Sequence, residues 1–327
     1  MRCFVTGIGG FVGLHLAEIL LAAGHDVTGL VTPTGAREGL RALAARHPRF
    51  APDGLAVADV TDRLAVERAL AAAEPERVFH LAAIAYAPHA EADPARTMAV
   101  NVLGALHVLD GARAVAPQAR ILVAGSSEAY GVVEPGDLPI VETTPLRPVS
   151  MYGVSKAAVD LAAFARAWTA GAQVIRVRAF NHTGPGQRPD FVCSDFARQL
   201  ARMEAGLTEP VLRVGNLEAA RDFTDVRDIV RGYAQLAEQG EVGEAYNLCT
   251  GEATTVARIV EILREESTVA VRCEEEPRRV RGREIPVVVG SAARAAAVGW
   301  RPAIPLRQTL CDLLQDWRRR IARNAAC

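Results

Sequence analysis

The sequence predicts an α/β protein with a doubly wound parallel sheet, followed by a smaller C-terminal α/β domain. Two observations indicate this class. Short apolar strands alternate with helical stretches through the first half of the chain, and a glycine-rich turn separates the first strand from the first helix. With 327 residues, half of them apolar, the chain can bury a sizeable core. A net charge of −1 gives no electrostatic reason to expect nucleic acid or an anionic membrane as partner.

The expected strands share a high content of apolar and β-branched residues. They are Arg2–Thr6, Asp26–Val31, Leu55–Asp59, Arg77–Leu81, Arg120–Ser126 and Gln173–Ala179. The expected helices between them are Gly13–Ala23, Arg63–Glu74, Asp93–Val115 and Tyr152–Ala170. Ligands of such sheets lie beyond the carboxyl ends of the strands. We expect residues 1–178 to bind a nucleotide cofactor, with returns of the chain near 219–249, and residues 179–327 to bind mainly substrate.

The turn after the first strand has three glycines at three-residue spacing, Gly7, Gly10 and Gly13. Gly7 permits the tight turn, Gly10 allows a diphosphate to approach the backbone, and Gly13 allows the helix to pack closely on the strand. The helix that follows would offer free N–H groups and positive potential to that diphosphate. This strand, turn and helix predict a Rossmann-type dinucleotide site.

A second pattern, Tyr152-x-x-x-Lys156, places a phenol and an amine one helical turn apart. A tyrosine with the ordinary pKa of about 10 is a poor proton donor or acceptor near neutrality. We expect the Lys156 cation to lower the pKa of Tyr152 and so prepare it for acid–base chemistry. Alone the pattern is weak evidence, because many helices carry it by chance.

Together the two patterns resemble the extended short-chain dehydrogenase/reductase superfamily of nucleotide-sugar enzymes, with Thr-Gly-x-x-Gly-Phe-x-Gly at the start and Tyr-x-x-x-Lys near the middle. Further matches follow in order along the chain, at 59–60, 78–83, Asn101, 126–131 and 299–302. The resemblance implies NADP(H) or NAD(H) as cofactor. The cofactor-binding residues that it implies are Gly7, Gly10, Phe11, Val12, Gly13, Thr32, Arg37, Asp59, Val60, Leu81, Ala82, Ala83, Asn101, Tyr152 and Lys156.

The choice between NADP and NAD depends on the end of the second strand. An acidic residue there would hold a ribose 2′-hydroxyl, but Val31 and Thr32 occupy this place. Arg37 lies a few residues on and can accommodate a 2′-phosphate, so NADP(H) is favoured. The alternative is that Arg37 is a solvated loop charge, which leaves NAD(H) open.

The resemblance also implies the catalytic residues. Tyr152 would exchange a proton with a sugar oxygen, Lys156 would tune the tyrosine and contact the nicotinamide ribose, and Ser126 would orient the carbonyl. Glu128 occupies the place at which the family's 4,6-dehydratases carry a base. In most of those enzymes an aspartate precedes the base, whereas Ser127 precedes Glu128 here, as a serine does in the GDP-mannose dehydratases.

The second half of the chain narrows the resemblance. Residues 178–187, 191–203 and 214–228 resemble the GDP-mannose 4,6-dehydratases and their partner reductases, and 87–96 is similar to the reductases. We therefore expect NAD(P)H-dependent reduction of the C4 ketone of a GDP-4-keto-6-deoxyhexose. The alternatives are a dehydratase or epimerase with tightly bound cofactor and Glu128 as base, and a non-catalytic nucleotide-binding protein. The expected substrate-binding residues are Ser127, Asn181, Val192, Arg202, Arg221, Arg281 and Glu284.

The remaining expectations concern surroundings and partners. The six cysteines have no metal-type spacing, so we expect reduced thiols, no metal and a cytoplasmic protein. No apolar run is expected to span a membrane. Helices Asp93–Val115 and Tyr152–Ala170 carry alanine- and leucine-rich faces. In the superfamily the equivalent pair forms a four-helix contact between two subunits, which implies a homodimer.

Overall fold

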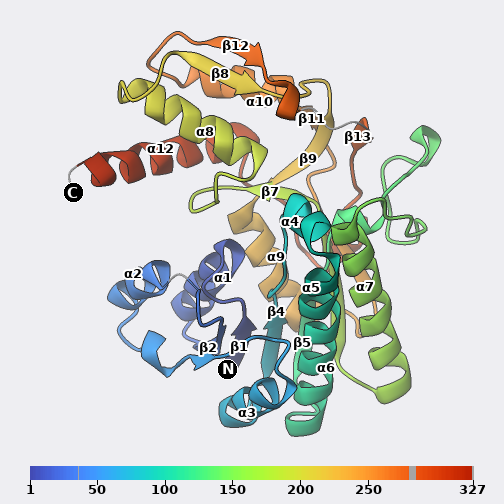
Figure 1. The fold of residues 1–327 in the computed structure, drawn as a ribbon. Coiled ribbons are helices and arrows are strands. Elements are labelled where there is room, and N and C mark those ends of the chain that lie inside the picture. Colours follow the sequence, from blue (N-terminus) through green and yellow to red (C-terminus); the bar gives the residue numbers. More distant parts are fainter. Residues whose placement is uncertain (36, 280–284, 326–327) are drawn as a thin grey trace.

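A parallel sheet of seven strands forms the centre of the larger part of the molecule (Figure 1). The structure is a computed structural model that describes residues 1–35, 37–279 and 285–325. The strand order is β10-β6-β5-β4-β1-β2-β3, so the direction of winding reverses between β1 and β4. The strands are β1 (Arg2–Thr6), β2 (Asp26–Val31), β3 (Ala56–Val57), β4 (Arg77–His80), β5 (Arg120–Ala124), β6 (Val174–Ala179) and β10 (Ala245–Leu248).

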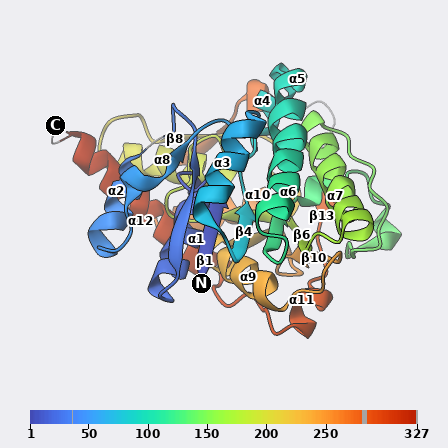
Figure 2. The same cartoon turned by 90° about the horizontal axis from the view of Figure 1, so that it is seen from below.

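Helices cover both faces of this sheet (Figure 2). One face packs against α1 (Phe11–Ala22) and α9 (Val226–Gln239), with α2 (Glu38–Arg46) beside α1. The opposite face packs against α3 (Arg63–Ala73), α6 (Gly104–Val115) and α7 (Met151–Ala170). The sequence prediction of a doubly wound parallel sheet is confirmed.

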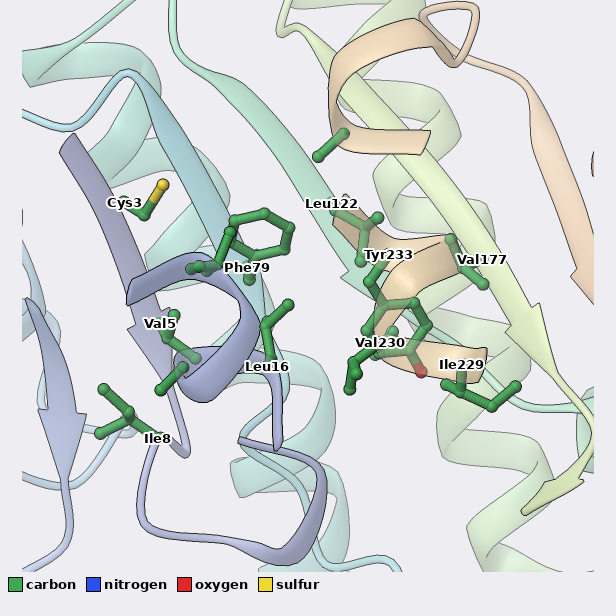
Figure 3. Close-up of a cluster of buried hydrophobic side chains, with 14 of the residues drawn as sticks. Cys3, Val5, Ile8, Leu16, Phe79, Leu122, Val177, Ile229, Val230 and Tyr233 are labelled. Atoms are coloured by element: carbon green, nitrogen blue, oxygen red, sulfur yellow. The ribbon is translucent and has the colours of Figure 1, made fainter. Parts of the chain in front are cut away.

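The core between the sheet and the α1–α9 layer explains why the strands read as apolar runs (Figure 3). Val5, Phe79 and Leu122 come from three neighbouring strands and are at most 1% exposed. Leu16 of α1 and Tyr233 of α9 pack onto them. Strands of a parallel sheet are buried on both faces, so their sequences lose the alternation of polar and apolar residues.

The region expected as one helix, Asp93–Val115, differs from the prediction. It consists of α5 (Pro94–Met98), a π-helical turn (Ala99–Leu103) and α6, and it is preceded by α4 (Ala87–Ala92), which the sequence did not indicate. The stretch Pro94–Val115 is also long and apolar enough to span a membrane by length and composition, contrary to expectation. Its inward residues pack on the sheet, as in a core helix.

The C-terminal part has its own small sheets and its own apolar core. Strands β7 (Asn181–Thr183), β11 (Ala253–Thr255) and β13 (Val287–Val288) pair with β9 (Ala220–Asp225), and β12 (Arg272–Glu275) pairs with β8 (Val211–Val214). Buried side chains of three helices form the core beside them. These helices are α8 (Val192–Glu204), α10 (Val256–Glu265) and α12 (Leu306–Ala325), and the short α11 (Ala293–Ala297) lies near β10.

The Gly299-Trp300-Arg301-Pro302 segment is fastened to α9. The buried Trp300 indole donates to the Asp228 carbonyl oxygen at 2.9 Å. The Asp228 carboxylate accepts the backbone N–H groups of Ala303 and Ile304 at 2.7 and 2.9 Å. These bonds fix the segment of chain that leads into α12. They explain structurally why a tryptophan stands in the Gly299-Trp300-Arg301-Pro302 motif.

Candidate active site

The glycine turn forms a backbone cradle at the carboxyl end of β1. Gly7 has a φ of +73°, and a Cβ there would lie 3.0 Å from the Ala82 nitrogen. A Cβ on Gly13 would lie 2.3 Å from the Gly7 carbonyl oxygen, so α1 can approach β1 only with glycine at this place. No side chain caps the N-terminus of α1. The turn therefore fits the diphosphate of a dinucleotide, which the N–H groups of Phe11 and Val12 would face.

Thr6 and His80, which the sequence analysis did not single out, brace the crevice between β1 and β4. The Thr6 hydroxyl accepts the N–H groups of Leu81 and Ala82 at 3.2 Å each and lies 2.9 Å from His80 Nδ1. Burial, with the Lys156 charge nearby, lowers the pKa of His80 to about 3. The ring is therefore neutral at physiological pH. These bonds hold Leu81, Ala82 and the adjoining Ala83 beside the glycine turn.

The residues expected around the adenosine part of the cofactor follow β2 and β3. Thr32 is exposed directly after β2, and Arg37 is the N-cap residue of α2. Asp59 accepts hydrogen bonds from Thr61 and an ion-pair contact from Arg96. Burial raises the pKa of Asp59, but the bonds from Thr61 and Arg96 outweigh it and the pKa is lowered. This carboxylate is therefore already engaged within the protein. Its neighbour Val60 is buried against Gly104.

Tyr152 and Lys156 lie on the first turns of α7, close to the carboxyl end of β5. The Lys156 ammonium donates to the Ala124 carbonyl oxygen at 2.6 Å and lies 5.9 Å from the centre of the Tyr152 ring. Burial lowers the pKa of Lys156 to about 8. Burial also raises the pKa of Tyr152 to about 12, although a hydrogen bond with Ser126 acts in the opposite direction.

This result corrects the expectation that Lys156 lowers the pKa of Tyr152. In this structure Lys156 is bonded to a strand carbonyl, and desolvation dominates the tyrosine. Tyr152 is therefore a neutral phenol, which can donate a proton. Desolvation could not be foreseen from the spacing of the two residues, because it depends on everything that packs around α7.

Ser126, Ser127 and Glu128 form the turn after β5. Ser126 is buried, and its hydroxyl accepts the Glu128 N–H at 3.2 Å, which caps the short 3-10 turn Ser127–Ala129. Ser127 is buried and Glu128 is exposed. The Glu128 carboxylate accepts a hydrogen bond from the Ser150 hydroxyl at 3.4 Å. The turn thus brings the Ser126 hydroxyl to the phenol of Tyr152, with Glu128 at the rim.

Asn101 is a buried link between two segments beside the site. Its amide oxygen accepts the Ile84 N–H at 2.7 Å, and its amide nitrogen donates to the Ile84 carbonyl at 3.1 Å and to the Ser155 hydroxyl at 2.8 Å. Ser155 in turn donates to the Tyr152 carbonyl oxygen at 2.7 Å. Asn101 thereby ties the loop after β4 to the helix that carries Tyr152.

The expected substrate-binding residues of the C-terminal part lie on several separate elements. Asn181 is exposed at the start of β7, and Val192 and Arg202 lie at opposite ends of α8. Arg221 of β9 donates to the carbonyl oxygens of Ala220 and Pro286. Arg281 and Glu284 lie outside the described residues.

A metal site is absent from the described part of the chain, where no group of three or more His, Cys, Asp or Glu residues could hold an ion. Within the same part, Cys3, Cys193, Cys249, Cys273 and Cys311 are free thiols.

A glycine cradle at a topological switch point, with a partly buried tyrosine and a buried lysine and serine beside it, defines a dinucleotide-dependent enzyme of the short-chain dehydrogenase/reductase type. Comparison with known families agrees. Residues 4–313 match the family model described as GDP-mannose 4,6 dehydratase. The chain belongs to this family of nucleotide-sugar enzymes.

Individual relatives support the same assignment. GDP-6-deoxy-D-mannose reductase of Pseudomonas aeruginosa is 37% identical over 98% of both chains. GDP-mannose 4,6-dehydratase of Sinorhizobium fredii is 28% identical over 95% of both chains. Among solved structures, RMD from Pseudomonas aeruginosa complexed with NADPH has a TM-score of 0.84 at 35% identity, covering 98% of this chain and 99% of that one.

A UDP-glucose 4-epimerase from Thermus thermophilus, in complex with NAD, has a TM-score of 0.83 at 30% identity, covering 97% of this chain and 99% of that one. The solved relatives thus hold NADPH or NAD. The predictions of the extended superfamily, of an NAD(P)-dependent nucleotide-sugar enzyme and of the cofactor class are confirmed.

The cradle can be tested by adding one methyl group. We expect Gly13→Ala to lose NADPH binding, because its Cβ would meet backbone atoms of Gly7 and Ile8 that cannot move aside. The measurement is NADPH fluorescence on titration with protein, with circular dichroism to establish folding. Gly136→Ala is the matched control, since nothing lies within 4 Å of its Cβ.

A milder variant covers the case in which Gly13→Ala fails to fold. Gly10→Ala places its Cβ 3.1 Å from the Gly7 carbonyl oxygen, a close but tolerable contact. We expect it to fold and to bind NADPH more weakly than the wild type. Full NADPH affinity in both folded variants would show that the cofactor does not bind at this turn.

Proposed function

We propose that the protein reduces the C4 ketone of a GDP-bound 4-keto-6-deoxyhexose, of the GDP-4-keto-6-deoxy-D-mannose type, with NADPH as the favoured hydride donor, in the cytoplasm. The observation that carries the proposal is the neutral, partly buried phenol of Tyr152 beside the buried Ser126 and Lys156. Reduction of a ketone needs a proton donor at the carbonyl oxygen, and a phenol that keeps its proton near neutrality is one.

A reduced nicotinamide cofactor, held through its diphosphate at the turn of Gly7, Gly10 and Gly13, would supply the hydride that is added to the ketone carbon. The proton that the oxygen then takes up comes from the Tyr152 hydroxyl, which is later refilled from solvent. Ser126, whose hydroxyl acts to lower the pKa of the Tyr152 phenol, would orient the carbonyl oxygen toward that phenol. Below pH 8 Lys156 is an ammonium ion, and its charge favours the phenolate that is left after proton transfer.

The sugar nucleotide would be held by the C-terminal part. We propose that the Arg221 guanidinium contacts the diphosphate, because its planar N–H groups match phosphate oxygens. Asn181, Val192 and Arg202 remain proposed substrate contacts, with Ser127 on the sugar side. Relatives of this family act on GDP sugars by name, which supports guanosine diphosphate as the nucleotide.

Dehydration is the second candidate, because Glu128 follows Ser126 closely and dehydratases are among the relatives. A base at this place would remove a proton from the sugar ring, and the cofactor would be regenerated in each cycle. Glu128 is exposed and accepts a hydrogen bond from Ser150, the N-cap residue of α7. Both features suit a residue that supports the helix, so reduction is favoured.

Cofactor stoichiometry distinguishes reduction from dehydration. With a GDP-4-keto-6-deoxyhexose we expect one NADPH consumed per sugar reduced, followed as absorbance at 340 nm, and no turnover of GDP-mannose. We expect Tyr152→Phe to lower kcat by about 10² to 10⁴ because the proton donor is lost. Glu128→Gln, which keeps the size of the side chain, should retain kcat within about tenfold.

The opposite pattern identifies the second candidate. Turnover of GDP-mannose without net NADPH consumption, lost in Glu128→Gln, would establish a dehydratase instead. No turnover of GDP-, UDP-, dTDP- or CDP-sugars by folded protein that binds NADPH would favour a non-catalytic nucleotide-binding protein.

The rate of reduction should depend on the charge of Lys156. Its pKa of about 8 means that the ammonium is present below pH 8 and is lost above it. We therefore expect kcat/KM to be level below pH 8 and to fall about tenfold per pH unit above it. Lys156→Arg, which stays charged, should lack this limb even if its rate is lower. A wild-type profile that is level to pH 10, or a limb kept in Lys156→Arg, would contradict this role.

A homodimer is proposed from the outer face of α7. Leu161, Phe164 and Trp168 lie at helical spacing and are 59%, 42% and 81% exposed, and the rings of Phe164 and Trp168 stack at 6.2 Å. Leu103, the residue that precedes the neighbouring α6, is 52% exposed. An ion pair between Asp110 and Arg166 at 2.6 Å joins the two helices. A two-fold axis would bury this face in a four-helix contact.

If this face of α7 joins two subunits, a charge placed on it should change the molar mass of the particle in solution from that of a dimer to that of a monomer. We expect the wild type to run as a dimer in size-exclusion chromatography with light scattering, and Trp168→Glu to run as a monomer, because a charge replaces the most exposed aromatic group. Leu207→Glu, on an exposed site of the C-terminal part, should stay dimeric. A monomeric wild type at micromolar concentration would refute the dimer.

A further inference from the structure

The short helix α4 contacts the first turn of α7 through one carboxylate. The Glu91 carboxylate accepts the N–H of Met151 at 2.6 Å. Met151 is the first residue of α7 and immediately precedes Tyr152. The first N–H groups of a helix have no partner within it, and a negative charge at that end is favourable. Glu91 therefore caps the helix that carries Tyr152 from a separate element.

The rest of this first turn is held by its own surroundings. The Ser150 hydroxyl accepts the Gly153 N–H at 3.0 Å. A Cβ at Gly153 would lie 2.6 Å from the Glu128 carbonyl oxygen, so the turn is packed tightly against the segment that carries Ser126. With the Glu91 contact on the remaining side, the backbone on both sides of Tyr152 is fixed.

The opposite end of α4 contacts the C-terminal part of the molecule. Tyr86, the N-cap residue of α4, has its ring centre 5.8 Å from that of Phe191 and 5.0 Å from that of His89. Phe191 is the N-cap residue of α8 and precedes Val192, a proposed substrate contact. Both rings are partly buried. In Figure 1, α4 lies between the upper end of α7 and the region of α8 and β7.

We infer that α4 positions Tyr152, with Glu91 as its contact to the catalytic helix and Tyr86 as its contact to the substrate-binding part. This inference rests on the proposed function, because it assumes that Tyr152 is the proton donor. The contacts form one continuous path from Phe191 through Tyr86, α4 and Glu91 to Met151. Glu91 acts only through the backbone of Met151, so it is a positioning residue and takes no part in proton transfer.

The first experiment compares Glu91→Ala with Glu91→Gln. The alanine variant removes the acceptor of the Met151 N–H, whereas glutamine keeps an oxygen at the same distance along the side chain. We expect kcat with NADPH and the ketosugar to fall about tenfold in Glu91→Ala, since small displacements of a reacting group are costly. The KM for the ketosugar should stay within about twofold. Glu91→Gln should recover most of the wild-type kcat.

A second readout does not need turnover. Hydrogen–deuterium exchange of the peptide that begins at Ser150 should speed up in Glu91→Ala and stay at the wild-type rate in Glu91→Gln. Glu67→Ala is the matched control, since Glu67 is a partly exposed carboxylate of α3 whose partner is Arg63 of the same helix. It should change neither kcat nor exchange in this peptide.

The third experiment tests whether α4 acts as one unit. Tyr86→Ala should also lower kcat, and the double variant with Glu91→Ala should be hardly slower than the slower single variant, because both changes interrupt one path. Fully multiplicative losses would refute the path through α4. Unchanged kcat and unchanged exchange in Glu91→Ala would refute the role of Glu91. If the wild type fails to reduce any ketosugar, the proposed function fails, and the exchange result still decides whether Glu91 caps α7.

Discussion

A buried carboxylate, Asp160 of α7, determines where the helix that carries Tyr152 and Lys156 lies against the sheet. It accepts two hydrogen bonds from Arg178, at 3.0 and 2.8 Å, and one from Arg176 at 2.6 Å, both on β6. Asp160 is 3% exposed and Arg178 is 5% exposed. Charges removed from water this far are tolerated only when their partners are placed well. Any sliding or rotation of α7 would leave the Arg176 and Arg178 cations of β6 without their partner. The contact with β6 therefore fixes the position of Tyr152 and Lys156.

The same network extends to the segment that carries Ser126. The Arg178 guanidinium donates to the Tyr130 hydroxyl at 3.0 Å and to the Glu142 carbonyl oxygen at 2.9 Å. The Tyr130 hydroxyl donates to the Asn247 side chain of β10 at 2.7 Å. Desolvation acts against the Arg178 charge, yet the bonds and charges of Asp160 and Tyr130 raise its pKa overall. The segment after β5 is therefore bonded to β6, and α7 is bonded to the same strand. These shared bonds explain how residues from two elements keep one geometry.

The local patterns were sufficient to predict the elements that follow simple rules. The bounds of β1 and β2 agree with the prediction, because hydrophobic runs and the glycine turn are local signals. The exact placement of Asn101 was not predictable from the sequence. It depends on the π-helical turn, from which the Asn101 amide reaches Ile84 and Ser155. Helix α4 has six residues and little apolar periodicity. No local sequence pattern therefore predicted either this helix or the contact of Glu91 with α7. Long-range hydrogen bonds leave no periodic trace in a sequence.

The direction of the pKa shifts is the clearest case of a property that belongs to the fold. From spacing alone, an amine one turn from a phenol lowers the pKa of the phenol. In the folded chain both groups are desolvated, which raises the pKa of Tyr152 to about 12 and lowers that of Lys156 to about 8. Burial thus keeps the proton on the phenol until an acceptor arrives. An alkoxide formed from a ketone is a much stronger base than the ketone oxygen, so the proton moves only when the substrate changes. A phenol that is protonated at neutral pH can donate to that alkoxide, which is the role that reduction requires of Tyr152.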